Sequence, residues 1–218
     1  MSQLILFDLD GTLIDSLDDI HTALTKAQAT FAIPPLHREV VKKYVGPGID
    51  ELLMKATEDS EISLEAFRNT YRDIYLDTHI HTALYKGIPE LLQTIKNKDA
   101  SLCVLTNKPE QAAKRLLQTF EISHFFDHII GPDTYGFCKP HPGSILELLK
   151  LYPEKPKKIF MVGDGDADIL VAKAASIQSI GVTYGYRTRE KLEGYKPTYL
   201  VDTVSELETL LKKLTTIN

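Results

Sequence analysis

The sequence is poor in the features that mark secreted, membrane-spanning or nucleic-acid-binding proteins. Cysteine occurs only twice, at Cys103 and Cys138, which gives no disulfide framework and is typical of a reducing cytoplasm. The net charge of -5 provides no basic tract for nucleic acid or an anionic membrane. No apolar run approaches the roughly 20 residues that span a bilayer. The first apolar run lacks a basic flank and is interrupted by Asp8, so we expect a cytoplasmic protein without a secretory signal.

The composition is that of an ordinary globular protein. Of the 218 residues, 43% are hydrophobic and 25% are charged, which is enough apolar material for a packed core. A chain of this length forms one large domain, or one domain that contains an insertion. The distribution of strand and helix signals decides between these two possibilities.

Hydrophobic periodicity divides the chain into a helical block and a region where strands and helices alternate. No strand signal is found between Ile14 and about Thr82, where apolar residues recur at three and four positions. The rest predicts parallel βαβ units with helices on both faces of the sheet. We therefore expect a Rossmann-like α/β core formed by residues 1–14 and 83–218, with a small all-helical domain inserted at 15–82. The expected helices cover 17–31, 37–44, 49–55, 64–79, 89–98, 109–120, 143–151, 169–175 and 205–213. The expected strands begin at residue 4 and cover 102–105, 128–130, 158–162, 179–182 and 199–201.

Two aspartates follow the first strand. Asp8 and Asp10 are two residues apart and are followed by Gly11 and Thr12. Ligands bind at the carboxyl ends of the strands in open parallel sheets. Two carboxylates placed there repel each other unless a cation or a shared proton relieves the repulsion. Alone, the motif also fits a helix-capping turn, so the ends of the other strands decide.

Two further strands end in polar residues. Thr106 and Asn107 follow one strand, and Asp164 follows another, with Asp168 one helical turn beyond. A parallel sheet brings these residues to one edge, where Lys139 from a separate loop adds a cation. Carboxylates suit Mg²⁺, which pairs with substrate phosphate, while Thr106, Asn107 and Lys139 suit the phosphoryl oxygens. One carboxylate can attack phosphorus and a second can transfer protons.

With these residues in place, the chain resembles the haloacid dehalogenase superfamily of phosphohydrolases, in its phosphoglycolate phosphatase-like branch. Four family motifs match in order, and the resemblance covers essentially the whole chain. The motifs are Asp8-Leu9-Asp10-Gly11-Thr12, Thr106 in Leu105-Thr106-Asn107, Lys139-Pro140, and Gly163-Asp164 with Asp168. The features of the branch are Asp15-Ser16, Val45-Gly46-Pro47-Gly48, and Gly185-Tyr186-Arg187 with Glu190 and Leu192.

The resemblance implies a Mg²⁺-dependent phosphoric monoester hydrolase. It makes Asp8 the nucleophile, which forms an aspartyl-phosphate, and Asp10 the general acid and base. It assigns Mg²⁺ to Asp8, to the backbone carbonyl of Asp10 and to Asp164, while Asp168 completes the metal shell or orients a metal-bound water. Thr106 and Lys139 would bind the phosphate. The helical insert would be a cap that closes over the site and excludes water.

The cap and the fourth motif contain the less specific candidates. Lys43, Gly46 and Gly48 are candidate contacts to the leaving group, although an ordinary solvated lysine is the preferred interpretation of Lys43. The fourth motif usually has Ser after Gly-Asp, whereas this chain has Gly165 and an extra acid, Asp166. Helix capping is the preferred interpretation of Asp166 over metal binding, because aspartate favours helix starts.

Several functions remain open on the same residues. 2-Phosphoglycolate is the leading substrate by resemblance, with pyrophosphate, nucleotides and sugar phosphates as alternatives. A sugar phosphomutase similar to β-phosphoglucomutase uses the same scaffold. A dehalogenase would not need the carboxylate of Asp10, and a non-enzymatic relic would be expected to lack one of the motif residues. A monomer and a homodimer are equally compatible with the sequence.

Overall fold

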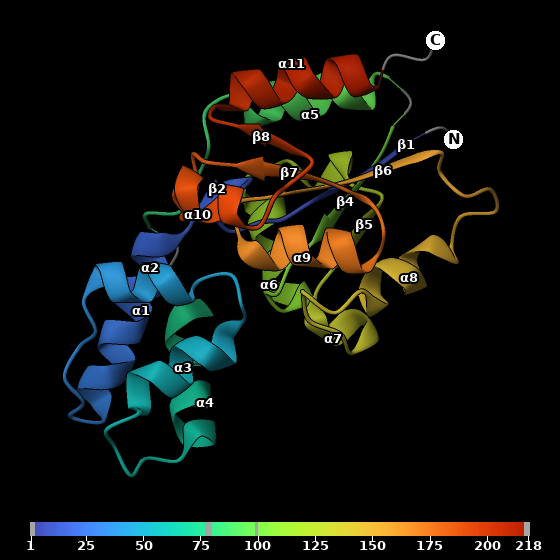
Figure 1. The fold of residues 1–218 in the computed structure, drawn as a ribbon. Helices are drawn as coiled ribbons and strands as arrows, with labels where there is room; N and C mark the ends of the chain where they lie inside the picture. The colour runs from blue at the N-terminus through green and yellow to red at the C-terminus, as the bar shows by residue number, and fades with distance from the viewer. Residues whose placement is uncertain (1–2, 77–79, 99, 216–218) are drawn as a thin grey trace.

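A six-stranded parallel sheet forms the centre of the computed structural model, which describes residues 3–76, 80–98 and 100–215 (Figure 1). The strand order is β5-β4-β1-β6-β7-β8, and all five neighbouring pairs are parallel. The predicted α/β class is therefore confirmed. The strands are β1 (Gln3–Phe7), β4 (Ser101–Leu105), β5 (His128–Ile130), β6 (Lys158–Gly163), β7 (Gln178–Val182) and β8 (Tyr199–Val201).

Both faces of the sheet are covered by helices, because the side chains of β1 alternate between two apolar clusters. Ile5 and Phe7 belong to a cluster with α5 (Ile88–Lys96) and α11 (Val204–Leu214). Leu4 and Leu6 belong to a cluster on the opposite face, together with α8 (Gly143–Leu149) and α9 (Asp166–Ala174). Every residue of β1 is buried. The residues that directly follow its carboxyl end therefore lie inside the protein, at one edge of the sheet.

The helical block has an apolar cluster of its own. It contains α1 (Leu17–Thr30), α2 (Arg38–Tyr44), α3 (Ile49–Thr57) and α4 (Leu64–Leu76), and it lies beside the carboxyl edge of the sheet (Figure 1). The last part of the predicted helix 64–79 lies outside the described residues. Leu24, Leu53 and Phe67 are fully buried in this cluster.

The chain enters and leaves the helical block through a short ribbon that the sequence did not predict. β2 (Ile14–Asp15) pairs antiparallel with β3 (Ala83–Leu84). Two-residue strands are too short to give a periodic signal. The boundary at 14/15 falls within β2 and the boundary at 82/83 falls directly before β3, and the division into two domains stays a prediction.

Three other differences concern helices. α9 begins at Asp166, three residues before the predicted start, because Gly165 is its N-cap and donates its N–H to Asp168 Oδ2 at 3.0 Å. The sequence did not predict α7 (Pro132–Tyr135) or α10 (Arg189–Gly194), and α6 covers Glu110–Thr119. A 3₁₀ turn at Ser123–Phe125 precedes β5. Among the described residues, none of the helices has the length and apolarity to cross a membrane.

Candidate active site

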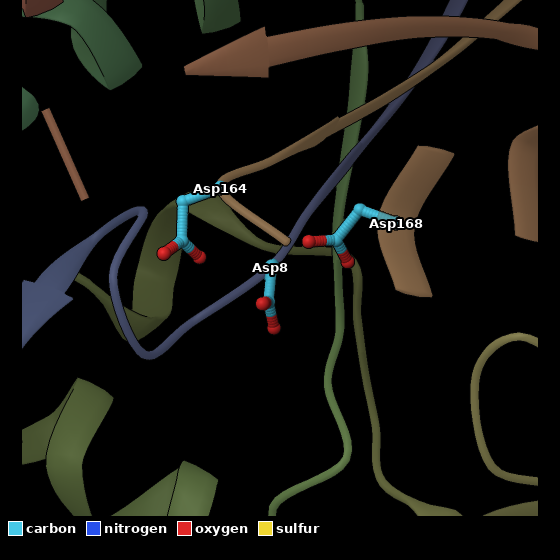
Figure 2. A group of neighbouring side chains, drawn as sticks. All are labelled: Asp8, Asp164 and Asp168. Carbon is cyan, nitrogen blue, oxygen red and sulfur yellow. The ribbon is translucent and has the colours of Figure 1, made fainter. Parts of the chain in front are cut away.

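Three carboxylates meet at the carboxyl edge of the sheet. Asp8 follows β1, Asp164 follows the neighbouring strand β6, and Asp168 lies in the first turn of α9 (Figure 2). One oxygen from each lies within 4.8 Å of the others. All three residues are at most 4% exposed. The sequence therefore predicted correctly that residues more than 150 positions apart converge on one place.

Two glycines of the motifs make room for these carboxylates. Gly11 has a φ of +85°, and a Cβ built there would collide with the carboxylate of Asp164. A Cβ at Gly163 would collide in the same way with the carboxylate of Asp168. The glycines are therefore required by the close approach of the acids, and Gly11 also by its left-handed backbone.

Lys139 bridges two of the acids. Its Nζ lies 2.8 Å from Asp8 Oδ1 and 2.7 Å from Asp168 Oδ1. The second oxygen of Asp168 accepts the N–H of Gly165 at 3.0 Å. The Leu9 N–H donates to Asp8 Oδ1 at 2.7 Å. Among the described residues none hydrogen-bonds Asp8 Oδ2, which is therefore the oxygen that can act on a ligand.

The electrostatics of this cluster favour a cation. Burial raises the pKa of Asp8, with a further increase from Asp168 that the charge of Lys139 opposes. Burial and the charges of Asp8 and Asp168 raise the pKa of Asp164 to about 8. For Lys139, burial lowers the pKa, but the charges of Asp168 and Asp8 outweigh it and the net shift is upward. The raised pKa values show that the ionised acids repel one another with only one ammonium among them; a divalent metal ion, which hard carboxylate oxygens fit, would relieve this repulsion.

Asp10 lies apart from this cluster. Its carboxylate accepts hydrogen bonds from Ser16 Oγ and from Lys108 Nζ. The Lys108 Nζ lies 3.1 Å from Asp10 Oδ1 and 2.9 Å from Asp10 Oδ2. The ion pair is buried, with 8% and 10% of the two side chains exposed. Lys108 was not among the predicted site residues. Its signal was its place in the loop after β4, directly behind Thr106 and Asn107.

The polar residues after β4 differ in what they contact. Thr106 is buried, and its Oγ1 accepts the N–H of Lys108 at 3.1 Å. Asn107 bonds to backbone on two sides: its Nδ2 donates to the carbonyls of Gly46, Pro47 and Lys139 at 2.9 to 3.0 Å, and its Oδ1 accepts the N–H of Lys139 at 2.8 Å. Phosphate binding by Asn107 stays a prediction, and in this structure its amide joins the helical block to the Lys139 loop.

A cavity of about 370 Å³ opens beside these residues. Asp8, Asp10 and the residues after β4 line it from the sheet side. Gly46 and Gly48 line it from the helical block, whereas Lys43 is exposed and does not line it. The cavity therefore lies between the two parts of the fold. The other residues that line it from the helical block are Ile20, Tyr44, Val45, Ile49, Leu52, Arg68, Tyr71, Arg72 and Tyr75.

Two residues after β7 also join the two parts, and their roles were not predicted. The Tyr186 N–H donates to Asp164 Oδ2 at 2.6 Å, and its hydroxyl accepts the Ser16 N–H at 2.9 Å. The buried Arg187 donates to the backbone carbonyls of Lys42, Lys43 and Val45 at 2.7 to 3.0 Å. The end of α2 is therefore bound by a core side chain.

Asp166 does not cap α9, which corrects the interpretation from the sequence. Its carboxylate accepts a hydrogen bond from the Tyr195 hydroxyl at 3.3 Å and lies 3.9 Å from Arg187 Nε. The N-cap is Gly165, and the acid that accepts the N-cap N–H is Asp168. Asp166 is also outside the group of three acids described above.

Known proteins with similar sequences and folds cover nearly the whole chain. The family model for haloacid dehalogenase-like hydrolases matches residues 5–182. A phosphoglycolate phosphatase from Aquifex aeolicus is 37% identical over 211 residues, which are 96% of each chain. Phosphoglycolate phosphatase 1 from Pseudomonas aeruginosa is 33% identical over 214 residues, 95% of this chain and 79% of that protein. The crystal structure of a predicted phosphoglycolate phosphatase from Haemophilus somnus 129pt superposes with a TM-score of 0.90 at 29% identity, over 99% of this chain and 98% of that one.

Proposed function

The chain belongs to the haloacid dehalogenase-like hydrolases and is a phosphoric monoester hydrolase, and we propose that it is a Mg²⁺-dependent phosphatase that cleaves 2-phosphoglycolate through an aspartyl-phosphate on Asp8. The main support is the cluster in which Lys139 bridges Asp8 and Asp168 next to Asp164. Nucleophile, phosphate-binding cation and metal ligands are thereby within reach of one phosphoryl group.

Asp8 and Asp10 would perform two successive displacements. In the first, an oxygen of Asp8 attacks phosphorus, the bond from phosphorus to the ester oxygen breaks, and Asp10 gives its proton to the departing alkoxide. In the second, Asp10 removes a proton from water, the water oxygen attacks phosphorus, and the bond to Asp8 breaks to release orthophosphate. Asp8 is suited to attack because its Oδ1 is held by Leu9 and Lys139 while Oδ2 is available.

Asp8 and Asp164 would hold the Mg²⁺, together with the backbone carbonyl of Asp10. The ion would offset the negative charge of the acids and polarise the phosphoryl oxygens. Lys139 would neutralise charge on the phosphate from the other side, and Thr106 would donate its hydroxyl. Asp168 would chiefly position Lys139, since its two oxygens already accept from Lys139 and Gly165.

Residues 15–82 would act as a cap that excludes water during the reaction. The cavity lies between this block and the sheet, and Gly46 and Gly48 line it from the cap side. Asn107 and Arg187 would hold the cap in place, because both donate to backbone carbonyls between Lys42 and Pro47. Closure of such a lid strengthens the electrostatic interactions inside the site.

2-Phosphoglycolate is proposed as the substrate because the relatives above are named for phosphoglycolate. The names of these relatives also favour hydrolysis over the transfer of phosphate between positions of a sugar. A panel of phosphate esters separates the alternatives. We expect the highest kcat/KM with 2-phosphoglycolate, and a higher value with pyrophosphate, a nucleotide or a sugar phosphate would reassign the substrate.

Mutation of the two acids tests the chemistry. Asp8→Asn should abolish turnover of 2-phosphoglycolate and of a generic aryl phosphate. Asp10→Asn should lower kcat by about 10²- to 10⁴-fold, the usual contribution of a general acid or base. EDTA should remove the activity and Mg²⁺ should restore it. Asp166→Asn is the matched control. Undiminished turnover in Asp8→Asn would exclude the aspartyl-phosphate route.

A further inference from the structure

Lys108 is a buried cation that the mechanism above does not use. Its Nζ lies 2.9 and 3.1 Å from the two carboxylate oxygens of Asp10 and 4.9 Å from the centre of the Tyr75 ring. Only 8% of its side chain is exposed. Tyr75 belongs to α4, so the ammonium is enclosed between the end of β4 and the helical block.

The two buried lysines divide the acids of the site between them. Lys139 forms ion pairs with Asp8 and Asp168, whereas the ion pair of Lys108 is with Asp10. Lys139 is therefore at the position of the phosphate, which Asp8 would attack. Lys108 is at the position of the leaving group, whose oxygen Asp10 would protonate.

The other cations that line the cavity are arginines of a different kind. The side chain of Arg68 is 40% exposed and is paired with Asp50 at 2.8 Å, and Arg72 and Arg115 are exposed. An exposed charge is screened by water and salt, while a buried ammonium interacts strongly with an anion that displaces the water around it. Among the described residues that line the cavity, Lys108 is the buried cation.

We propose that Lys108 binds a carboxylate on the leaving group of the substrate and thereby selects phosphate esters of hydroxy acids. This inference rests on the proposed function. A phosphorylated 2-hydroxy acid has phosphate, ester oxygen and carboxylate in succession; with Asp8 at the phosphate and Asp10 at the ester oxygen, the cation that forms an ion pair with Asp10 and lines the same cavity is Lys108. A neutral alcohol would leave the ammonium without a second anionic partner.

The same contact would bring Asp10 to the ester oxygen. In the structure both oxygens of Asp10 accept from Lys108, and Ser16 donates to one of them. A substrate carboxylate that accepts a hydrogen bond from the Lys108 ammonium would replace one of its two contacts with Asp10. The Asp10 oxygen released in this way can turn to the leaving group, and Lys108 still has an anionic partner. Esters without a carboxylate would have to break the buried pair uncompensated, which lowers their kcat as well as their affinity.

The test compares 2-phosphoglycolate with 2-phosphoglycolamide, in which a neutral amide replaces the carboxylate at the same size. Wild-type enzyme with saturating Mg²⁺ should prefer the acid by about 10- to 150-fold in kcat/KM, the factor for one charge-assisted hydrogen bond that only the acid can make. In Lys108→Met this ratio should fall to near one. Any loss that comes from the broken pair with Asp10 affects both substrates and cancels in the ratio. Arg115→Met is the control for an exposed cation of the cavity and should keep the wild-type ratio.

Three results would overturn the proposal: a wild-type ratio near one, a wild-type-like ratio in Lys108→Met, or loss of the ratio in Arg115→Met. The first of these needs no variant, so it holds even if Lys108→Met does not fold, and Lys108→Gln provides a second neutral side chain. Turnover of an aryl phosphate with neither glycolate ester cleaved would remove both the carboxylate site and the substrate assignment, yet leave the phosphatase function standing. Absence of turnover with any phosphate ester would instead refute the proposed function itself.

Discussion

We predict that the charge of Asp19 stabilises the segment through which the chain passes from the helical block back to the sheet. Asp19 lies in the first turn of α1 and is fully buried. Its carboxylate accepts from the N–H groups of Ile80, His81 and Thr82 at 2.7 to 3.2 Å and from Thr82 Oγ1 at 2.5 Å. The segment it holds leads directly into β3, through which the block is joined to the sheet.

Asp19→Asn should therefore cost far more than an ordinary polar substitution. The amide keeps one acceptor oxygen but turns an NH₂ group toward N–H donors, so at least one of these donors loses its acceptor and the bonds that remain are no longer to a charged group. A hydrogen bond to a charged group contributes about 1.5 to 3 kcal/mol, and an orphaned buried donor costs about 1 to 3 kcal/mol. Since these contributions overlap, we expect the free energy of unfolding to fall by about 2 to 4 kcal/mol.

Urea unfolding followed by circular dichroism measures this loss, and Asp18→Asn is the matched control. Asp18 is the preceding residue, and it pairs with Arg38 at 2.6 Å on the surface, with 55% and 42% of the two side chains exposed. Such an exposed pair contributes about 0 to 1 kcal/mol. Equal losses in the two variants, or a loss below about 1 kcal/mol in Asp19→Asn, would refute the reasoning.

The pH dependence gives a second check. Burial would raise the pKa of Asp19, but the hydrogen bonds from Thr82, His81 and Ile80 outweigh it and lower the pKa in the folded state. The stabilising contribution is thus fully present above the pKa of the unfolded chain. It is lost as the pH falls through the lower folded-state pKa. The difference in unfolding free energy between wild type and Asp19→Asn should shrink over that acidic interval and stay constant at neutral pH.

Two further predictions concern the acid cluster. Gly11→Ala and Gly136→Ala both introduce a Cβ at a positive φ, of +85° and +80°, but only the first collides with Asp164. Both variants should lose about 1 to 2 kcal/mol of stability. Only Gly11→Ala should raise the Mg²⁺ concentration needed for half-maximal activity, by about 10-fold or more. Equal Mg²⁺ requirements in the two variants would contradict this. Asp168→Asn removes one of the two carboxylates that hold Lys139, so kcat/KM should fall by about 10- to 150-fold at saturating Mg²⁺. A kcat/KM within about two-fold of that of Asp166→Asn would show that Lys139 does not need this partner.

The sheet and the meeting of the acids were predictable because they depend on local patterns and on topology. The apolar runs before Asp8, Thr106 and Asp164 are short and bounded by turn signals, and these are the central strands β1, β4 and β6. Parallel pairing then brings their carboxyl ends together with no further information. The start of α9 was misplaced because the pattern of apolar residues begins only at Ile169, whereas a cap at Gly165 starts the helix earlier.

The parts that could not be predicted depend on contacts between distant segments. Nothing near Asp19 in the sequence indicates that three consecutive N–H groups at residues 80–82 converge on its carboxylate. Likewise, Lys108 follows β4 like any polar loop residue, and only the approach of α4 to this loop places Tyr75 against its ammonium. Local propensity predicts neither contact, because the stabilisation of each residue comes from a distant element that packs against it.

The division of the acids between two lysines has a consequence for catalysis. If Asp10 shared Lys139 with Asp8 and Asp168, three carboxylates would share one ammonium, and their repulsion would favour protonation of Asp8. Lys108 gives Asp10 a buried ion pair that is separate from the pairs of Lys139, and the charge of Asp10 raises the pKa of Asp8 less than the charge of Asp168 does. In the proposed mechanism Asp8, whose ionised form the charge of Lys139 favours against the effect of burial, would attack phosphorus, while Asp10 would exchange protons with the leaving group and with water. The separation is therefore built by two cations from different loops, one after β4 and one before α8, and a neutral side chain at either position should impair the two steps differently.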